Sequence, residues 1–161
     1  MQKLLLNKDD FTYWVDLSQN IEEKQLNPHI LEAQDRVLEG AMCSSLYNEV
    51  YTQFLDDTLT TENELLLNNY MKPLLVFASY ANYLVTAGKR STSTGMVKVV
   101  GDNLEQITRD ELNDIKKSVD SSEVFRHNRL ENFLKNNKDV YPLYEDCCKT
   151  QKAGFNITSI G

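Results

Sequence analysis

The centre of the fold is set by residues 74–87, which read LLVFASYANYLVTA. This stretch is apolar on nearly every side of a helix, and such a pattern is typical of a helix that packs against several neighbours. Pro73 stands at its start and predicts a kink or a break in the helix. Gly88 follows it and is a usual residue at a helix end. We therefore expect a mainly α protein with this helix in its core.

Helical patterns continue on both sides of the central stretch. Before it, the apolar face rotates around Cys43, which predicts two segments, about 28–42 and 44–56, rather than one straight helix. Asn27-Pro28 suits a helix start, since Asn caps free amides and Pro fits the first turn. Thr61-Glu62-Asn63-Glu64 fits a capping box for the helix that leads into the central stretch.

After the central stretch, Thr108-Arg109-Asp110-Glu111 fits a second capping box. A helical pattern follows it and ends at Asn136-Asn137, and Tyr141-Pro142-Leu143-Tyr144 then predicts a turn with aromatic anchors. The expected architecture is a bundle of about four to five helices with a short β arm and extended termini. The core is expected from these apolar residues: Ile30, Val37, Leu46, Leu74, Phe77, Leu84, Ile115, Leu130 and Phe133.

The chain divides into three expected parts. Residues 1–26 form an N-terminal arm or short elements, residues 27–145 a helical domain with a projecting arm at 89–103, and residues 146–161 a C-terminal tail. The alternation in Val97-Lys98-Val99 predicts a short extended arm or a hairpin in this region. Because a lone hairpin is marginally stable in water, it must lean on its own domain or on a neighbouring molecule. The residues expected at such contacts are Arg90, Thr92, Thr94, Met96, Val97, Val99, Phe155, Ile157 and Ile160.

The charge distribution argues against a nucleic-acid binder. The formal net charge is −7, whereas proteins that bind phosphate backbones carry an excess of Lys and Arg. Residues 1–80 hold 13 acidic and 5 basic residues. This excess is explained either by solubility or by an acidic surface that faces a DNA passage or a less acidic partner.

The cysteines and the ends of the chain bear on its location. Three cysteines, Cys43, Cys147 and Cys148, are an odd number without a metal-binding spacing, which predicts a reducing compartment. The role of the adjacent pair stays open. Residues 1–8 lack a signal-peptide pattern, and residues 73–88 are too short and too polar to span a bilayer, so we expect a soluble protein without a membrane.

Signals for catalysis are almost absent from the sequence. His29 and His127 have no partner in a familiar metal-binding spacing, and no glycine-rich phosphate loop occurs. Adjacent carboxylates such as Asp56-Asp57 diverge on a helix and do not converge on one substrate. We therefore expect no enzyme activity, no catalytic residue, no metal and no cofactor.

The order of the motifs resembles small virion proteins of Bacteroides-infecting tailed phages, including the crAss-like group. Ile30-Leu31-Glu32-Ala33-Gln34 with Leu46-Tyr47 matches the pattern I-x-E-A-Q … L-Y, and residues 92–97 match T-x-x-G-x-V. The helix 125–134 and the turn 141–144 complete the resemblance, which spans about residues 15–145. Met42-Cys43 departs from the Leu-Gly that precedes the Leu-Tyr element in relatives.

That resemblance implies a head–tail connector protein, an adaptor or neck subunit that joins portal to tail. It implies a mainly helical fold, no enzyme activity and a ring of 12 copies through which DNA passes without specific binding. The chain would lie in the virion at the head–tail interface, and in the host cytoplasm before assembly. The alternative is a soluble helical interaction or packaging-accessory module that is not part of a ring.

Overall fold

The computed structural model describes residues 3–17, 20–86, 89–92, 95–98 and 109–144. Within them the chain is mainly helical, which confirms the expected mainly α class. The helices are α1 (Lys8–Thr12), α2 (Glu23–Ala33), α3 (Glu39–Met42), α4 (Ser44–Leu55), α5 (Thr61–Leu66), α6 (Lys72–Thr86) and α7 (Arg109–Asn136). Two π-helical turns, η1 (Gln34–Leu38) and η2 (Leu67–Met71), and two strands, β1 (Lys89–Thr92) and β2 (Gly95–Lys98), complete the described elements.

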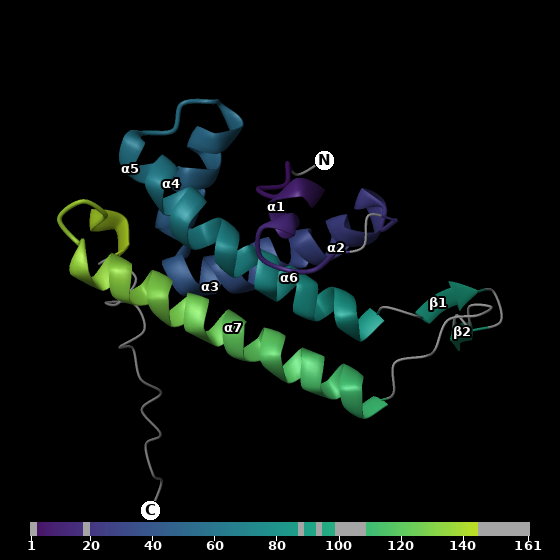
Figure 1. The fold of residues 1–161 in the computed structure, drawn as a ribbon. Helices are drawn as coiled ribbons and strands as arrows, with labels where there is room; N and C mark the ends of the chain where they lie inside the picture. Colours follow the sequence, from purple (N-terminus) through teal and green to yellow (C-terminus); the bar gives the residue numbers. More distant parts are fainter. Residues whose placement is uncertain (1–2, 18–19, 87–88, 93–94, 99–108, 145–161) are drawn as a thin grey trace, which may run out of the picture.

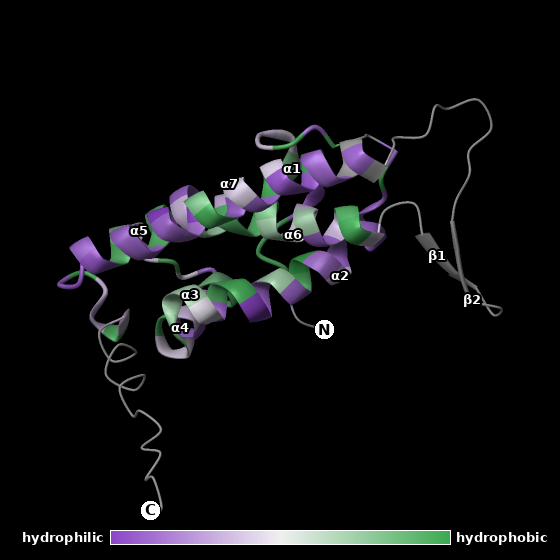
Figure 2. Ribbon diagram, turned by 90° about the horizontal axis from the view of Figure 1, so that it is seen from below, coloured by the Kyte–Doolittle hydropathy of each residue, from purple (hydrophilic) through white to green (hydrophobic). Residues whose placement is uncertain are grey.

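Helix α6 occupies the centre of the molecule, as its nearly all-apolar sequence predicts. It packs against α2 on one side and against α7 on another (Figure 1). Figure 2 shows the same contrast in hydropathy, with apolar residues concentrated on α6 and hydrophilic residues on α7. Leu74, Leu75 and Val76 are fully buried, so the burial of this helix supplies much of the apolar area that holds the bundle together.

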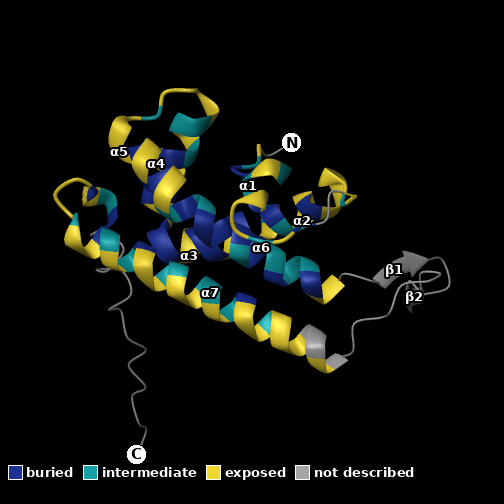
Figure 3. Cartoon of the chain, in the orientation of Figure 1, coloured by how far each residue is buried: buried dark blue, intermediate teal, exposed yellow. Residues whose placement is uncertain are grey.

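Most of the predicted core residues are buried. Ile30, Val37, Leu46, Leu74, Leu84 and Leu130 all lie in the interior. Phe77 and Phe133 are partly buried and pack against the core. Ile115 is an error of the prediction, because its side chain is 39% exposed. It lies in the first part of α7, where the apolar spacing is helical but Figure 3 shows a largely exposed surface.

The region around Pro73 shows how the chain accommodates a proline inside a long helix. The helical path runs without a break from Thr61 to Thr86, and the π-helical turn η2 ends at Met71, two residues before Pro73. A proline ring collides with the carbonyl four residues earlier in a regular α-helix. The wider π turn is a known way of relieving that collision. The expected break is therefore absent, and the chain changes its helix type locally before the proline.

Two helix starts differ from the predictions by a few residues. α2 begins at Glu23, not at Pro28, and Glu22 and Gln25 form its capping box. Pro28 lies inside the helix, where both Pro28 and Lys24 are exposed, so water can solvate the carbonyl that the proline leaves without a donor. The cap of α5 is Thr60, not Thr61, because the Thr60 side chain accepts a hydrogen bond from the amide of Asn63.

The N-terminal residues belong to the hydrophobic core. Leu5, Leu6 and Phe11 are buried in it, and Asn7 caps α1 by accepting a hydrogen bond from the amide of Asp10. Lys72 on α6 forms an ion pair of 3.0 Å with Asp10. The segment before α2 therefore packs against the helical body rather than standing apart from it.

The predicted change of direction at Cys43 is present. Cys43 has φ 71° and separates α3 from α4, which matches the two segments inferred from the rotating apolar face. Cys43 is buried, and its sulfur lies 3.8 Å from the carbonyl oxygen of Tyr144. Cys147 and Cys148 lie outside the described residues, so the expectation of a reducing compartment stays a prediction.

The C-terminal end of the described chain is anchored by tyrosines, as predicted. Asn137 follows the last residue of α7 and donates its side-chain amide to the carbonyl of Phe133 at 2.8 Å. Tyr141 and Tyr144 are buried, and the Tyr141 hydroxyl donates to the carbonyl of Glu62 at 2.8 Å. These contacts fix the end of α7 against α5.

No helix in the described part of the chain combines the length and the apolar character needed to cross a bilayer. The long helix α7 is rich in charged residues, and the apolar helix α6 contains 15 residues.

Candidate functional site

The hairpin of β1 and β2 carries four of the predicted contact residues. Arg90 and Thr92 lie on β1, and Met96 and Val97 lie on β2. The strands pair antiparallel, with Arg90 opposite Val97 and Lys89 opposite Lys98. The other predicted contact residues lie outside the described residues, namely Thr94, Val99, Phe155, Ile157 and Ile160.

The hairpin stands beyond the end of the helical body (Figure 1). In the described part of the chain, the extensive contacts of each strand are with the other strand rather than with a helix. A two-stranded sheet of this kind buries little apolar surface on its own, so its stability depends on what else it meets.

A second feature lies at the opposite end of the body, on α4, α5 and the turn between them. We call it the acidic end and define it by its carboxylates, which are Glu49, Asp56, Asp57, Glu62 and Glu64. All five residues are exposed, and the ion pairs of the described chain include none of them. Glu49 accepts a hydrogen bond of 3.0 Å from the Asn63 side chain, which ties α4 to α5.

A third feature is an aromatic patch that combines the loop after α1 with the middle of α7. It consists of Trp14, Phe125 and Arg126. The guanidinium of Arg126 lies 4.5 Å from the centre of the Trp14 ring and 5.7 Å from that of Phe125. Trp14 is 39% exposed and Phe125 is 62% exposed. Exposed aromatic residues grouped around an arginine are the composition found at the centres of protein–protein interfaces.

The environment of Arg126 is unusual for a surface arginine. Burial lowers the pKa of its guanidinium, and the positive charge of Arg129 lowers that pKa further. Its Nε atom is buried and has no hydrogen-bond partner among the described residues. The contacts of Arg126 are therefore mainly with aromatic rings, which attract a cation through their electron-rich faces.

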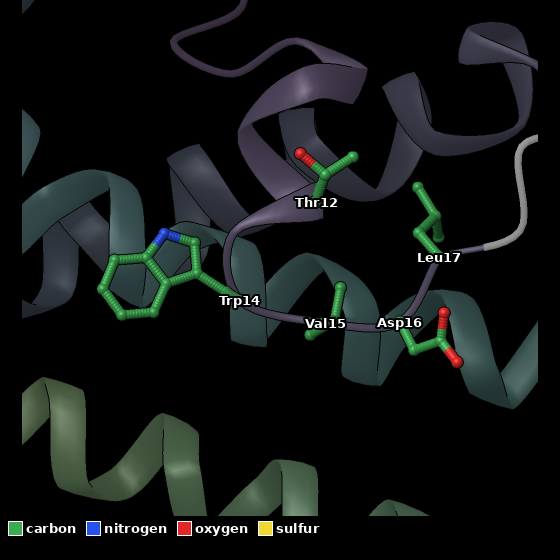
Figure 4. Close-up of a pocket in the computed structure, with 5 residues that line it drawn as sticks. All are labelled: Thr12, Trp14, Val15, Asp16 and Leu17. Carbon is green, nitrogen blue, oxygen red and sulfur yellow. The ribbon is translucent and has the colours of Figure 1, made fainter.

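A shallow depression of about 400 Å³ lies beside this patch and is lined by Thr12, Trp14, Val15, Asp16 and Leu17. Figure 4 shows that the Trp14 indole points away from the Asp16 carboxylate, so the lining side chains do not converge on one point. The depression contains one carboxylate and one hydroxyl, and it brings no base next to a nucleophile. It offers no arrangement for catalysis.

The two histidines make structural contacts. His29 Nε2 lies 3.0 Å from the Thr86 hydroxyl, and that hydroxyl donates to the carbonyl of Tyr83. The contact between His29 and Thr86 holds the end of α6 against α2. His127 lies 3.8 Å from Glu131 on the same helix. Across the described residues, no group of three or more His, Cys, Asp or Glu side chains could hold a metal ion.

The sequence patterns did not indicate the aromatic patch. Tyr13 and Trp14 follow no sustained period, and Arg126 only interrupts the apolar stripe of its helix. The charged residue within the apolar stripe could have indicated the patch, since a buried charge needs a polar or aromatic partner that an apolar core does not supply. The partner, Trp14, comes from a distant part of the sequence.

Comparison with known proteins gives one family. No curated protein and no solved structure matches the chain. The model of DUF6712, described as a family of unknown function, matches residues 38–154. That match includes α4 to α7 and the hairpin, and thus most of the chain. The protein therefore belongs to the DUF6712 family.

Proposed function

We propose that this protein is a head–tail connector subunit of a tailed phage. In this role it joins portal to tail as one copy of a ring, with 12 copies as the expected number, and DNA passes through the ring without specific binding. The protein acts by binding its neighbours, and it has no enzyme activity, metal or cofactor. It is part of the virion and passes through the host cytoplasm before assembly.

The hairpin is the observation that carries this proposal. A ring subunit needs a rigid body together with segments that become stable against neighbouring subunits. The helices supply such a body, and the short β arm at 89–98 makes its extensive contacts within itself. A second chain can complete the strand edges of such an arm with backbone hydrogen bonds. Head-to-tail contacts of this type close into a ring when the rotation allows it.

Two further observations support the proposal. The order of the motifs at residues 30–34, 46–47 and 92–97 resembles connector proteins of crAss-like and related phages. The acidic charge of residues 1–80 suits a surface beside a DNA passage, because carboxylates repel the phosphate backbone. Neutralising those acids that face the passage is expected to slow genome ejection or to leave DNA bound.

The decisive test uses purified virions. Mass spectrometry is expected to detect the chain in them, and an electron-microscopy reconstruction of the neck is expected to place it as a ring beneath the portal. A chain that is abundant in the infected cell and missing from virions would refute the proposal. That result would favour the alternative of an interaction or packaging-accessory module.

Deletion of residues 91–100 tests the role of the arm. The shortened chain is expected to keep its helix content in circular dichroism, because the helices of the body do not depend on the hairpin. It is expected to stay out of the virion. A shortened chain that enters virions at the normal level would show that the arm is not an assembly contact.

A further inference from the structure

The hairpin and the acidic end carry opposite charges. From residue 37 to residue 71 the sequence contains six acidic residues and no Lys or Arg. From residue 87 to residue 101 it contains Lys89, Arg90 and Lys98 and no acidic residue. The chain thus places an uninterrupted negative segment and an uninterrupted positive segment on different elements.

These two segments cannot meet within one copy of the chain. The continuous helical path from Thr61 to Thr86 begins at the acidic end and leads to β1. At a rise of 1.5 Å per residue, its 26 residues separate the two ends by about 39 Å. Figure 1 shows the same arrangement, with α4 and α5 at one end of the molecule and the strands beyond the other. Any contact between them has to join two copies.

A negatively charged partner is expected to stabilise the hairpin. Lys89 and Lys98 occupy directly paired positions in its register, and like charges at paired positions destabilise a hairpin. An acidic surface that approaches both lysines removes this repulsion.

The acidic end, in turn, has the charge and the exposed apolar side chains to bind a positively charged and partly apolar partner. Its exposed carboxylates have no ion pair within the described residues. Two leucines at the same end, Leu55 and Leu65, are 44% and 43% exposed. The hairpin sequence supplies the complement, since Met96 and Val97 lie on β2 beside the basic residues. Charge complementarity with an apolar contact is the pattern of a specific interface.

We propose that the β1–β2 hairpin of one copy docks on the acidic end, at α4 and α5, of the next copy of this chain. The contact is head-to-tail, so each copy uses one surface to receive its neighbour and another to reach the following one. Repetition of such a contact closes into a ring or continues as a filament, depending on the rotation between copies. This inference rests on the proposed function, because it names the surface that receives the arm of a ring subunit.

Cross-linking identifies the contact directly. A photoreactive benzoylphenylalanine replaces Ser91 in the full chain, and this chain is mixed with an isotopically heavy copy in low-salt buffer. Mass spectrometry is expected to find cross-links between light and heavy copies that join position 91 to peptides of α4 or α5. A lack of cross-links between copies, or cross-links to another surface, overturns the proposal.

Charge exchange provides the second test, read by light scattering and sedimentation at low and high salt. One double variant changes the acidic end, by Asp56→Lys with Glu64→Lys, and a second changes the hairpin, by Lys89→Glu with Arg90→Glu. Each is expected to raise the dissociation constant between copies by about tenfold or more. The chain with all four changes is expected to associate again, because the attraction is restored with its signs exchanged. Failure of that combined chain to associate overturns the proposal.

A matched control separates this contact from a general effect of charge. Asp9→Lys with Glu23→Lys alters the net charge by the same amount at two exposed residues of α1 and α2, and it is expected to associate like the wild type. An equal loss in the control refutes the specific contact. A different result would refute the proposed function. If the chain associates through this interface but is missing from virions, the inferred contact stands and the connector role is refuted.

Discussion

The backbone amide of Leu5 donates a hydrogen bond of 2.7 Å to the side-chain oxygen of Gln34, and this bond is buried. Gln34 opens the π-helical turn η1 and is fully buried among apolar residues. It thereby connects the N-terminal segment to the helices 29 positions further along the chain. A buried amide of this kind has no access to water, so its partner determines whether the segment is stable in place.

Removing this acceptor is expected to weaken the fold. Gln34→Leu leaves the Leu5 amide buried without a partner, which costs about 2 kcal/mol in the free energy of unfolding. Urea denaturation followed by circular dichroism measures the change. The control is Asn68→Ala at an exposed position, which is expected to stay within about 0.5 kcal/mol of the wild type. Equal losses in the two variants would contradict the role of Gln34.

The cap of α5 is testable at two neighbouring threonines. Thr60→Ala removes the side-chain oxygen that accepts from Asn63, and a lost cap of this type costs about 1 kcal/mol of stability. Thr61→Ala removes the same atoms from an exposed side chain in the first turn and is expected to cost much less. Thermal unfolding of both variants measures the two losses of stability. A larger loss of stability for Thr61→Ala would show that Thr61, which the sequence pattern indicated, is the cap.

The contact between Arg126 and Trp14 has a built-in optical probe, because the chain contains a single tryptophan. Arg126→Ala uncovers the indole, and we expect its fluorescence to shift to longer wavelength with a loss of about 1 kcal/mol of stability. Arg129→Ala is the matched control, since that guanidinium lies over the Tyr70 ring instead. Its Trp14 emission is expected to stay unchanged. Identical spectra for Arg126→Ala and the wild type would show that the cation does not cover the ring.

The stability of the protein is expected to depend on pH through His29. Burial lowers the pKa of His29 in the folded protein, while the charge of Glu32 has a smaller, opposite effect. The unfolded chain therefore binds the proton more readily than the folded one, and the contribution of His29 to stability is lost as the pH falls through 6.5. The His29 side chain is only partly buried, which keeps the effect small.

Urea denaturation at about pH 7.5 and about pH 6 measures this dependence. His29→Gln keeps a side chain that can hydrogen-bond to Thr86 and is expected to reduce the difference between the two pH values. His127→Gln leaves His29 in place and is expected to retain the wild-type difference. A His29→Gln variant with an undiminished difference would place the pH dependence elsewhere.

The candidate contact surfaces were predictable only in part. The contact role of the segment with Lys89, Arg90 and Val97 could be predicted, because basic and β-branched residues lie close together in the sequence there. The aromatic patch brings together Trp14 and Arg126, which are more than a hundred residues apart in the sequence. Local periodicity does not predict a contact over that separation. The acidic end is visible as a charge run in the sequence, but its separation from the hairpin follows from the unbroken helix of residues 61–86.

The amino-acid sequence alone determined the helical class, the central position of residues 74–86, the break at Cys43 and the end of α7, because each depends on periodicity or on the backbone preferences of one or two residues. Only the tertiary structure decided that Leu5 and Phe11 enter the core, that Ile115 stays exposed and that Pro73 sits within a continuous helical path. These outcomes depend on which surfaces of other elements are available to cover a given side chain or relieve a given collision. That availability arises from packing between distant segments, and a linear pattern does not contain it.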